Sequence, residues 1–397
     1  MKPMCPVALH GSFPTALSLN DLKNLAPSSS QAPPVDHDQQ LAYGTAQGSP
    51  QLRRRIAELH SPPPGQGPQL TEDNVVIAPG SIMANFLALS AILAPGDHVV
   101  CQYPTYGQLY LLPGYSDVDV SLWAMQEADG WRPDVSRIAG LIKPNTKAII
   151  LNNPNNPTGA VLSKHQLEQI RDLAREKNIT LFADEVFAPL FFDYDDDNDN
   201  ESNAPPPPPP LVTLGYDRSV STGSLSKAYS LPGIRIGWIV SPDAALIRRV
   251  MTLRDYTTIS VSLLDQGVAS FALSADVLPR IIARNVALCK ESVSLIEEFV
   301  GRSGGRCTWV RPRGAGVAFI KFLRDAAAGG KEQPVDDRAF SQELAEREGI
   351  SSVPGELCFS ASGREDFKGY VRLTLGEPER LRKHLRTIEA FHLKSDF

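Results

Sequence analysis

The residues with the clearest chemical potential gather around one lysine, Lys227. This lysine ends the run STGSLSK over residues 221–227, and Arg235 follows it eight residues later. Two polar motifs lie upstream, NNPNNPTG over residues 152–159 and ADEV over residues 183–186. Together these segments supply an amine, a carboxylate, side-chain amides, hydroxyls and a guanidinium.

That inventory matches what is needed to hold pyridoxal 5′-phosphate (PLP) as a Schiff base and to tune it as an electron sink. A nucleophilic lysine must lose its proton, which burial or a nearby cation favours. Arg235 would supply that cation and pair with a phosphate, and Ser224 would hydrogen-bond the same phosphate. The run around Lys227 is weak evidence alone, because most lysines are surface residues.

Two further segments could bind the ring and the phosphate, and each has an ordinary alternative. Gly80, Ser81 and Ile82 stand where a strand turns into a helix, and the N–H groups of a helix N-terminus bind anions. Asp184 ends an apolar strand, where a carboxylate is costly unless it is paired. Opposite a pyridinium nitrogen it would keep that nitrogen protonated. The alternatives are a plain turn for the first segment and a helix cap or salt bridge for the second.

Three more side chains complete the candidate set. Asn156 could donate its amide to the phenolic oxygen of the ring, although Asn and Pro also form turns by themselves. Tyr103 could stack on the ring, or it could be a core aromatic at a strand end. Arg372 lies in an otherwise apolar strand and should pair with a carboxylate, either of a substrate or of the protein.

The surrounding pattern predicts the elements that bring these residues together. Strand-like segments at 75–78, 98–101, 148–151 and 180–183 alternate with helices at about 82–93 and from Ser163, which forms a capping box with Gln166. Such alternation with continuous apolar strands predicts an α/β fold with a mostly parallel sheet covered by helices on both faces. Ligands bind such sheets beyond the carboxyl ends of the strands. The candidates that follow strand-like runs are Gly80, Asn156, Asp184 and Lys227.

The rest of the chain divides into an insertion and a smaller lobe. Residues 193–210 are acidic and end in six prolines, which predicts a solvated, partly polyproline II insertion. A long helix is predicted from about Ala283, then strands at 308–310, 317–320 and 370–373 and helices near 340–347 and from Pro378. We therefore expect an N-terminal segment (1–40) on the small domain or the domain junction, a large PLP-binding domain (41–282) and a small α+β domain (283–397).

Composition excludes several classes of function. The 397-residue chain carries a net charge of −6, which argues against nucleic-acid binding. It has no apolar run of the roughly 18 residues that would span a membrane, and its start lacks the apolar region of a signal peptide. Its five cysteines are scattered without a C-x-x-C pair, so we expect no disulfide framework or metal site and a reducing, cytoplasmic location.

From about Leu41 to Phe391 the chain resembles the fold-type I, class I/II aminotransferases. The most specific motifs are NNPTG over 155–159, DEV over 184–186, and Ser224-x-x-Lys227 with Arg235. Segments 254–259 and 309–312 resemble the branch of this family that contains capreomycidine-synthase-like proteins.

The resemblance implies a role for each candidate. Lys227 would form the internal aldimine with PLP, Asp184 would pair with the pyridine nitrogen, and Tyr103 would stack on the ring, these three being the catalytic set. The phosphate would be held by Gly80, Ser81, Ile82, Ser224 and Arg235. Asn156 would contact the phenolic oxygen and the substrate, Arg372 the substrate α-carboxylate, and Tyr43 the phosphate of a neighbouring subunit in a homodimer.

Two departures from the family pattern affect the expected reaction. Phe187 stands where the family usually has a tyrosine that hydrogen-bonds the phenolic oxygen, and residues 10–14 (HGSFP) replace the usual substrate loop. We expect transfer of an amino group from an amino acid to a 2-oxo acid. The alternative is β- or γ-elimination, replacement or cyclisation in specialised metabolism. A non-catalytic ligand sensor would have lost Lys227 or Asp184, and a Ser-Lys hydrolase built on Ser224 would leave the other motifs without a role.

Overall fold

The computed structural model describes residues 7–27, 33–67, 69–192, 194, 205–324, 333–361, 364 and 366–394. Most of the acidic part of the predicted insertion, residues 193 and 195–204, lies outside these ranges. The strands are β1 (Val7–Ala8), β2 (Val75–Ala78), β3 (His98–Tyr103), β4 (Asp119–Ala124), β5 (Thr146–Asn152), β6 (Thr180–Asp184), β7 (Ser219–Ser224), β8 (Gly237–Val240), β9 (Cys307–Trp309), β10 (Val317–Arg324), β11 (Gln333–Pro334), β12 (Ile350–Ser351), β13 (Val353–Pro354) and β14 (Tyr370–Thr374). The helices are α1 (Leu19–Leu25), α2 (Pro50–Leu59), α3 (Ser81–Ile92), α4 (Gln108–Tyr115), α5 (Lys164–Lys177), α6 (Ala244–Asp255), α7 (Leu263–Ala272), α8 (Leu278–Arg302), α9 (Asp337–Glu348), α10 (Gly355–Phe359) and α11 (Pro378–Lys394).

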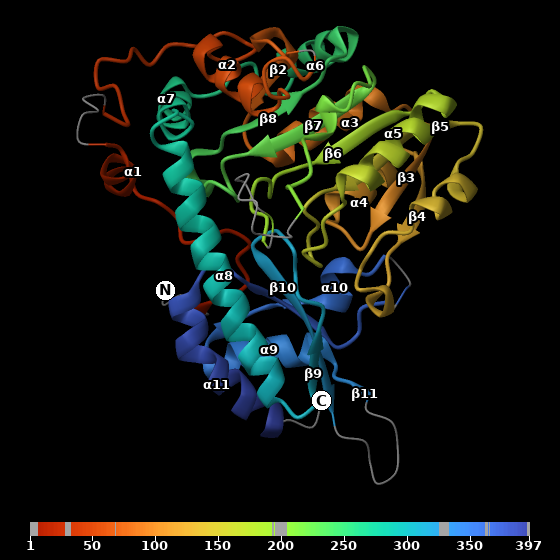
Figure 1. Ribbon diagram of the computed structural model, residues 1–397, viewed down its shortest axis with the longest axis vertical. Coiled ribbons are helices and arrows are strands. Elements are labelled where there is room, and N and C mark those ends of the chain that lie inside the picture. Colours follow the sequence, from red (N-terminus) through yellow and green to blue (C-terminus); the bar gives the residue numbers. More distant parts are fainter. Residues whose placement is uncertain are drawn as a thin grey trace.

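A seven-stranded sheet in the order β2-β8-β7-β6-β5-β3-β4 forms the centre of the larger part (Figure 1). Strands β4, β3, β5, β6 and β7 are parallel, whereas β8 runs antiparallel to both of its neighbours. Strand β2 therefore runs in the same direction as β7. The prediction of a mostly parallel sheet is confirmed, with β8 as the one reversed strand of this sheet.

Both faces of the sheet are buried under helices, which explains the continuous apolar strands. Every residue of β2, β3 and β6 is buried. Apolar side chains of α3, α4 and α6 pack on one face, and those of α5 pack on the opposite face. The predicted capping box of α5 is present, because Ser163 and Gln166 hydrogen-bond each other's backbone N–H.

The C-terminal part is built on a second, antiparallel sheet around β10, which pairs with β9, β11 and β14. Helix α8 runs from the level of the large sheet to this smaller one (Figure 1). It begins at Leu278, five residues before the predicted start at Ala283, with a proline in its first turn. Helix α11 begins at Pro378 as predicted.

The N-terminal segment is attached to the C-terminal part by backbone hydrogen bonds. Strand β1 pairs with β12, and the Thr374 N–H donates to the Leu9 carbonyl. The Thr15 N–H donates to the Gly376 carbonyl. Residues 10–14 are thus held at both ends against the last residues of β14, the strand that carries Arg372.

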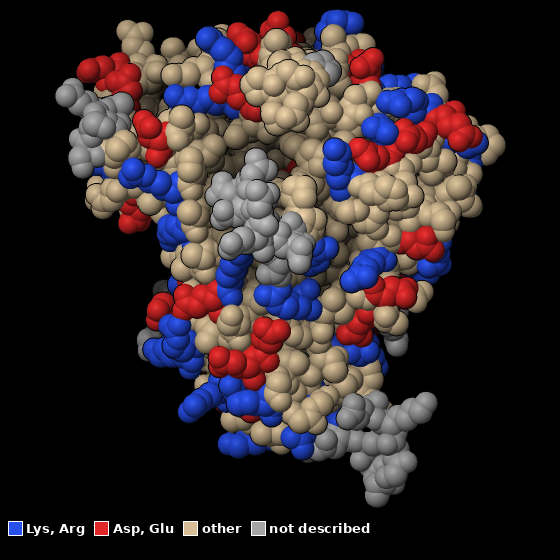
Figure 2. Space-filling model, in the orientation of Figure 1, with Lys and Arg blue, Asp and Glu red and all other residues tan. Residues whose placement is uncertain are grey.

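Figure 2 shows the distribution of charged side chains on one face of the molecule. On the face shown in Figure 2, basic and acidic side chains are interspersed over both parts of the molecule. Within the described ranges, every helix is too short or too polar to cross a membrane.

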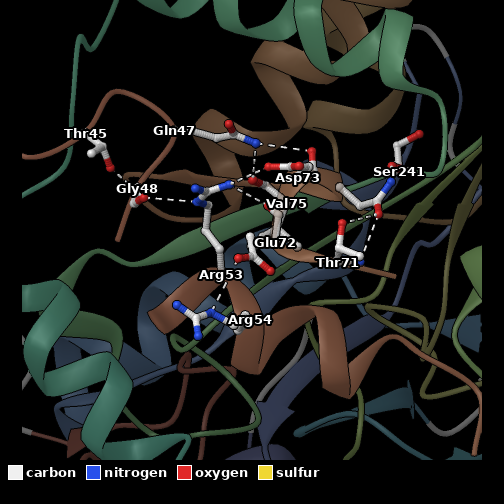
Figure 3. A network of polar contacts seen from close by, with 11 residues as sticks. Thr45, Gln47, Gly48, Arg53, Arg54, Thr71, Glu72, Asp73, Val75 and Ser241 are labelled. Atoms are coloured by element: carbon white, nitrogen blue, oxygen red, sulfur yellow. Dashed lines mark hydrogen bonds and ion pairs between the residues drawn. The ribbon is translucent and has the colours of Figure 1, made fainter. Parts of the chain in front are cut away.

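A buried arginine ties the loop after Tyr43 to the sheet (Figure 3). Arg53 of α2 donates from Nε to the Gly48 carbonyl at 3.0 Å and from Nη1 to the Glu72 carbonyl at 2.6 Å. Gln47 donates to the Val75 carbonyl at the start of β2. Removing the guanidinium would take away one of the two donors of each carbonyl, because Gly48 also accepts from Thr45 Oγ1 and Glu72 also accepts from the Val75 N–H.

We predict that Arg53→Leu destabilises the protein by about 1–3 kcal/mol, because it removes two hydrogen bonds donated by a buried charged group. Its neighbour Arg54 is exposed and forms only a surface ion pair with Glu72, so Arg54→Leu should change stability by less than about 0.5 kcal/mol. Thermal unfolding of the two variants under identical conditions tests this difference. Equal midpoints would contradict the structural role given to Arg53.

Candidate active site

Most of the predicted site residues lie near one edge of the large sheet. Strands β2, β5, β6 and β7 all end there, and the antiparallel β8 begins there just after Arg235. Asn152, Asp184 and Thr222 are consecutive register partners on β5, β6 and β7, so their side chains lie on the same face. The expectation that the candidates gather beyond the carboxyl ends of the strands is met by this topology.

A cavity of about 330 Å³ opens at this edge. Of the predicted residues, its walls contain Ser81, Ile82, Asn156, Asp184, Lys227, Arg235 and Arg372. Three cations and one carboxylate thus surround a single space. Such a cavity suits a ligand that carries more than one anionic group and one site of positive charge.

Lys227 projects into this cavity with its amine only partly compensated. Its Nζ donates to Ser12 Oγ at 2.6 Å and lies over the ring of Phe13, both from the N-terminal segment. Burial lowers the pKa of Lys227 to about 8, and the charge of Arg372 acts in the same direction. More of the amine is therefore uncharged near neutral pH than for an ordinary lysine, and the uncharged form is the one that acts as a nucleophile or base.

Asp184 is buried at the end of β6, and both of its carboxylate oxygens accept hydrogen bonds. The Val186 N–H donates to Oδ1 at 3.0 Å, and the side-chain amide of Asn85 donates to Oδ2 at 2.9 Å. Burial raises the pKa of Asp184, while these two hydrogen bonds and the charge of Lys227 oppose that rise. Asn85 was not among the predicted residues, although it is a polar residue inside an apolar helix, four positions after Ser81.

An anion-binding corner forms where α3 begins. Gly80 caps this helix with a positive φ of 83°, and a Cβ at this position would lie 2.4 Å from Arg235 Nη2. The missing side chain therefore lets the guanidinium lie across the helix N-terminus, beside Ser81. Arg235 Nη1 also lies 3.5 Å from Ser226 Oγ. Backbone N–H groups, hydroxyls and a guanidinium in one place are what a phosphate group binds.

Arg372 reaches the opposite wall from β14. Its Nη1 donates to Asn156 Oδ1 at 3.0 Å and its Nη2 donates to the His10 carbonyl at 2.7 Å. Its Nε is buried without a hydrogen-bond partner among the described residues. Burial lowers the pKa of Arg372 to about 10, so the group stays cationic at neutral pH. The orphaned Nε is a donor available to a ligand carboxylate.

The structure places Tyr103 outside this cavity, which corrects its predicted position on the ring. Its hydroxyl donates to Asp366 Oδ2 and accepts from the Ala361 N–H, both at 2.8 Å, so the side chain bridges to the C-terminal part. Tyr106, three residues later, lines the cavity instead. Burial raises the pKa of Tyr106, and the nearby charge of Asp184 adds to this effect. The YPTY run contains both tyrosines, and the sequence did not distinguish them.

Of three other positions considered from the sequence, Ser224 and Tyr43 do not line the cavity and Phe187 does. Ser224 is buried at the end of β7, where its Oγ accepts from the Ser226 N–H, and Ser226 lines the cavity instead. Tyr43 is 84% exposed on the loop before Arg53, and its predicted role toward a neighbouring subunit stays a prediction. Phe187 is buried in the cavity wall. The tyrosine hydroxyl that the family resemblance predicts at this position would therefore have belonged to the site.

The arrangement fits PLP, the cofactor that the sequence resemblance implies. A phosphate suits the corner formed by Gly80, Ser81 and Arg235, and a ring nitrogen suits the buried Asp184 carboxylate. Lys227 lies in the same cavity with a lowered pKa. The orphaned Nε of Arg372 remains for the carboxylate of an amino acid. Groups of three or more potential metal ligands are absent from the described residues.

Comparison with known proteins gives a consistent result. The model of the family described as "Aminotransferase class I and II" matches residues 15–388. Capreomycidine synthase of Streptomyces vinaceus is 30% identical over 315 residues, which cover 79% of this chain and 73% of that protein. An arginine–pyruvate transaminase of Pseudomonas aeruginosa is 29% identical and covers 84% of this chain and 77% of its own length.

Solved structures agree with the relatives found by sequence. A PLP-dependent aminotransferase from Streptococcus suis superposes with a TM-score of 0.82 at 30% identity, over 99% of this chain and 95% of that one. An aspartate aminotransferase from Thermotoga maritima gives a TM-score of 0.76 at 25% identity, over 98% and 92%. The similarity extends over both the large sheet and the C-terminal part.

We predict that Lys227 in the cofactor-free protein reacts with acetic anhydride in a pH-dependent way, with a midpoint near its pKa of about 8. Below this pH the amine is protonated and unreactive, and above it the amine is free. Arg372→Leu should move the midpoint upward, because it removes a nearby positive charge that disfavours protonation. Mass spectrometry of peptides after brief labelling measures this, with the exposed Lys290 as the reference for reagent reactivity. An unchanged midpoint in the variant would contradict the electrostatic coupling.

Proposed function

Because this chain belongs to the class I and II aminotransferase family, we propose that it transfers the amino group of an amino acid to a 2-oxo acid. The enzyme uses PLP, which stabilises negative charge at the Cα of a bound amino acid. The observation that carries the proposal is the placement of Lys227, Asp184 and Arg372 around one cavity, with a lowered pKa at the lysine.

Each residue then has a defined task. Arg235, Ser81 and the N-terminus of α3 bind the cofactor phosphate, and Asp184 holds the proton of the ring nitrogen. Arg372 binds the α-carboxylate of the amino acid through a bidentate contact that includes Nε, which fixes the orientation of the substrate. Asn156 accepts from Arg372 Nη1 and lines the same cavity, where it would contact the phenolic oxygen of the ring.

Lys227 acts as the general base. Its uncharged amine would take the proton from the substrate Cα and, as an ammonium group, would hold that proton for return within the same cavity. Ser12 accepts a hydrogen bond from Nζ, which limits the directions in which the amine can point. Ser12 and His10 belong to the segment held against β14, so this segment also helps to keep water away from the lysine.

A second candidate is cyclisation or elimination of an amino acid in specialised biosynthesis. Two observations favour it: the 30% identity to a capreomycidine synthase, and the apolar Phe187 in the cavity wall where the resemblance predicts a hydroxyl. Both reactions begin with removal of the Cα proton by Lys227, and they differ in the bonds that form and break after that removal. The substrate side chain is not specified by Arg372, which serves only the α-carboxylate.

We further propose that the enzyme is a cytoplasmic homodimer with domains at 41–282 and 283–397. Large exposed apolar residues occur on two loops, Leu41 and Tyr43 on one and Tyr256 and Ile259 on the other. The loops are neighbours, because Gly44 packs against Leu263. Exposed apolar surface of this kind is typical of a subunit interface. The four described cysteines are free, in keeping with a reducing compartment.

We predict that the purified protein with PLP, given a suitable amino acid and no acceptor, releases one 2-oxo acid per site and then stops. Adding a 2-oxo acid should restart the reaction. Lys227→Ala should lower the rate by at least about 10²-fold, since proton transfer by a positioned base contributes at least that much. The exposed Lys290→Ala provides a matched control that should behave as wild type. Continued turnover without an acceptor would contradict transamination and support the second candidate.

We also predict that the protein sediments at twice its chain mass of 43.2 kDa. Replacing Tyr43 and Tyr256 by Asp should shift the sedimentation toward the monomer, because charges would enter the interface. Analytical ultracentrifugation at several concentrations makes the measurement. A wild-type monomer at all concentrations would contradict the proposed dimer.

A further inference from the structure

The Asp184 carboxylate accepts a hydrogen bond from a buried polar network that takes no direct part in the proposed reaction. Asn85 lies four residues after Ser81 on α3, so both side chains project from the same face of the helix. This face packs on the sheet, and its other buried residues are apolar: Ala84, Leu87, Ala88 and Leu89. Asn85 is completely buried among them.

The sheet supplies the partner of Asn85. Thr222 is the register partner of Asp184 on the neighbouring strand β7, and parallel register places both side chains on the face under α3. Thr222 is completely buried, and its Oγ donates to Asn85 Oδ1 at 2.6 Å. The amide of Asn85 therefore bridges Thr222 and Asp184.

The direction of the Asn85 amide is fixed by its surroundings. Its Nδ2 donates to Asp184 Oδ2 at 2.9 Å and to Gln108 Oε1 at 3.2 Å. Gln108 is itself oriented, because its Nε2 donates to the Ile82 carbonyl at 2.7 Å. Turning the Asn85 amide over would set its oxygen against the carboxylate and against Gln108 Oε1, which are both acceptors. Only a donor can face Asp184 in this network.

We propose that Asn85 and Thr222 are positioning residues that keep Asp184 ionised and aimed at the ring nitrogen of the cofactor. A donor directed at a buried carboxylate stabilises its charged form and opposes the effect of burial. This inference rests on the proposed function, because it assumes that the ring nitrogen faces Asp184. The hydroxyl of Thr222 acts through Asn85 and does not touch the carboxylate.

Packing alone would not call for these two residues. Leucine and valine have the same branching and number of heavy atoms as asparagine and threonine, and they would fill an apolar helix–sheet interface without any polar group to satisfy. The network instead places polar groups where each one needs a partner. Asn85, at the centre of the network, donates directly to the Asp184 carboxylate in the cavity wall.

The test is a pH titration of the visible absorbance of the PLP-loaded protein. Asn85→Leu removes the donor to Asp184 and keeps the same branching and number of heavy atoms. The ring nitrogen then loses its proton more easily, and its charge no longer repels the proton on Lys227 Nζ, the atom that joins the protein to PLP. The midpoint of the titration should rise, and PLP should dissociate roughly 10- to 100-fold more readily, the effect of losing one hydrogen bond to a charged group. We expect kcat to fall while KM changes little, because Arg372 still binds the substrate.

A matched pair at the second position covers the case in which Asn85→Leu does not fold. Thr222→Val removes the hydroxyl that orients Asn85, and Thr222→Ser keeps it. We expect the titration midpoint to rise in the valine variant and to stay near wild type in the serine variant. Thr146→Val removes the hydrogen bond from another buried pair, Thr146 and His98, at the other end of the strands. It should lower the unfolding temperature and leave the titration unchanged.

The outcomes are distinguishable. A titration of Asn85→Leu that superimposes on wild type, or equal titrations of the Thr222→Val and Thr222→Ser variants, would overturn the inference and leave the network with a structural role only. Wild-type protein that binds PLP but produces no 2-oxo acid would contradict the proposed transamination without affecting this comparison. The titration requires bound PLP, not turnover.

Discussion

The burial of one carboxylate, that of Asp184, is the constraint around which the site is organised. A buried charge is costly unless hydrogen bonds and an opposite charge compensate it. Here the compensation comes from three elements: the turn after β6 through the Val186 N–H, helix α3 through Asn85, and the loop after β7 through Lys227. Each of these elements begins or ends at the same sheet edge, so the topology of the strands makes the compensation possible.

The other charged residues of the cavity are all cations. Lys227, Arg235 and Arg372 share one space with a single carboxylate. Burial lowers the pKa of both Lys227 and Arg372, and the charges of the two arginines add to this effect at Lys227. The excess of positive charge favours the binding of a phosphate at the corner beside Gly80 and of a carboxylate at the orphaned Nε of Arg372.

Much of this could be predicted from the sequence, because the motifs follow the chain order of the strands. Asp184 and Lys227 come directly after apolar runs, and parallel strands bring such positions to one edge. The residues that the sequence did not predict do not follow the ends of the parallel strands. Asn85 comes from the middle of a helix, and Ser12 comes from a segment held against a strand more than 300 residues later in the chain. Nothing in their local sequence reveals those neighbours. Tyr103 and Tyr106 illustrate a second limit of prediction from sequence. They are three residues apart in a turn, where no periodicity indicates which of the two rings faces the cavity.

In the proposed mechanism, the N-terminal segment contacts both the arginine that binds substrate and the lysine that acts as base. The His10 carbonyl accepts from Arg372 Nη2, and Ser12 accepts from Lys227 Nζ two residues later. Each Nη of Arg372 carries two N–H groups and has one acceptor here, so a carboxylate at Nε and one Nη need not displace Asn156 or the His10 carbonyl. Because His10 and Ser12 are two residues apart, the backbone that orients Arg372 also positions the hydroxyl that orients Lys227. The HGSFP sequence of residues 10–14 therefore links the arginine subsite to the surroundings of the base.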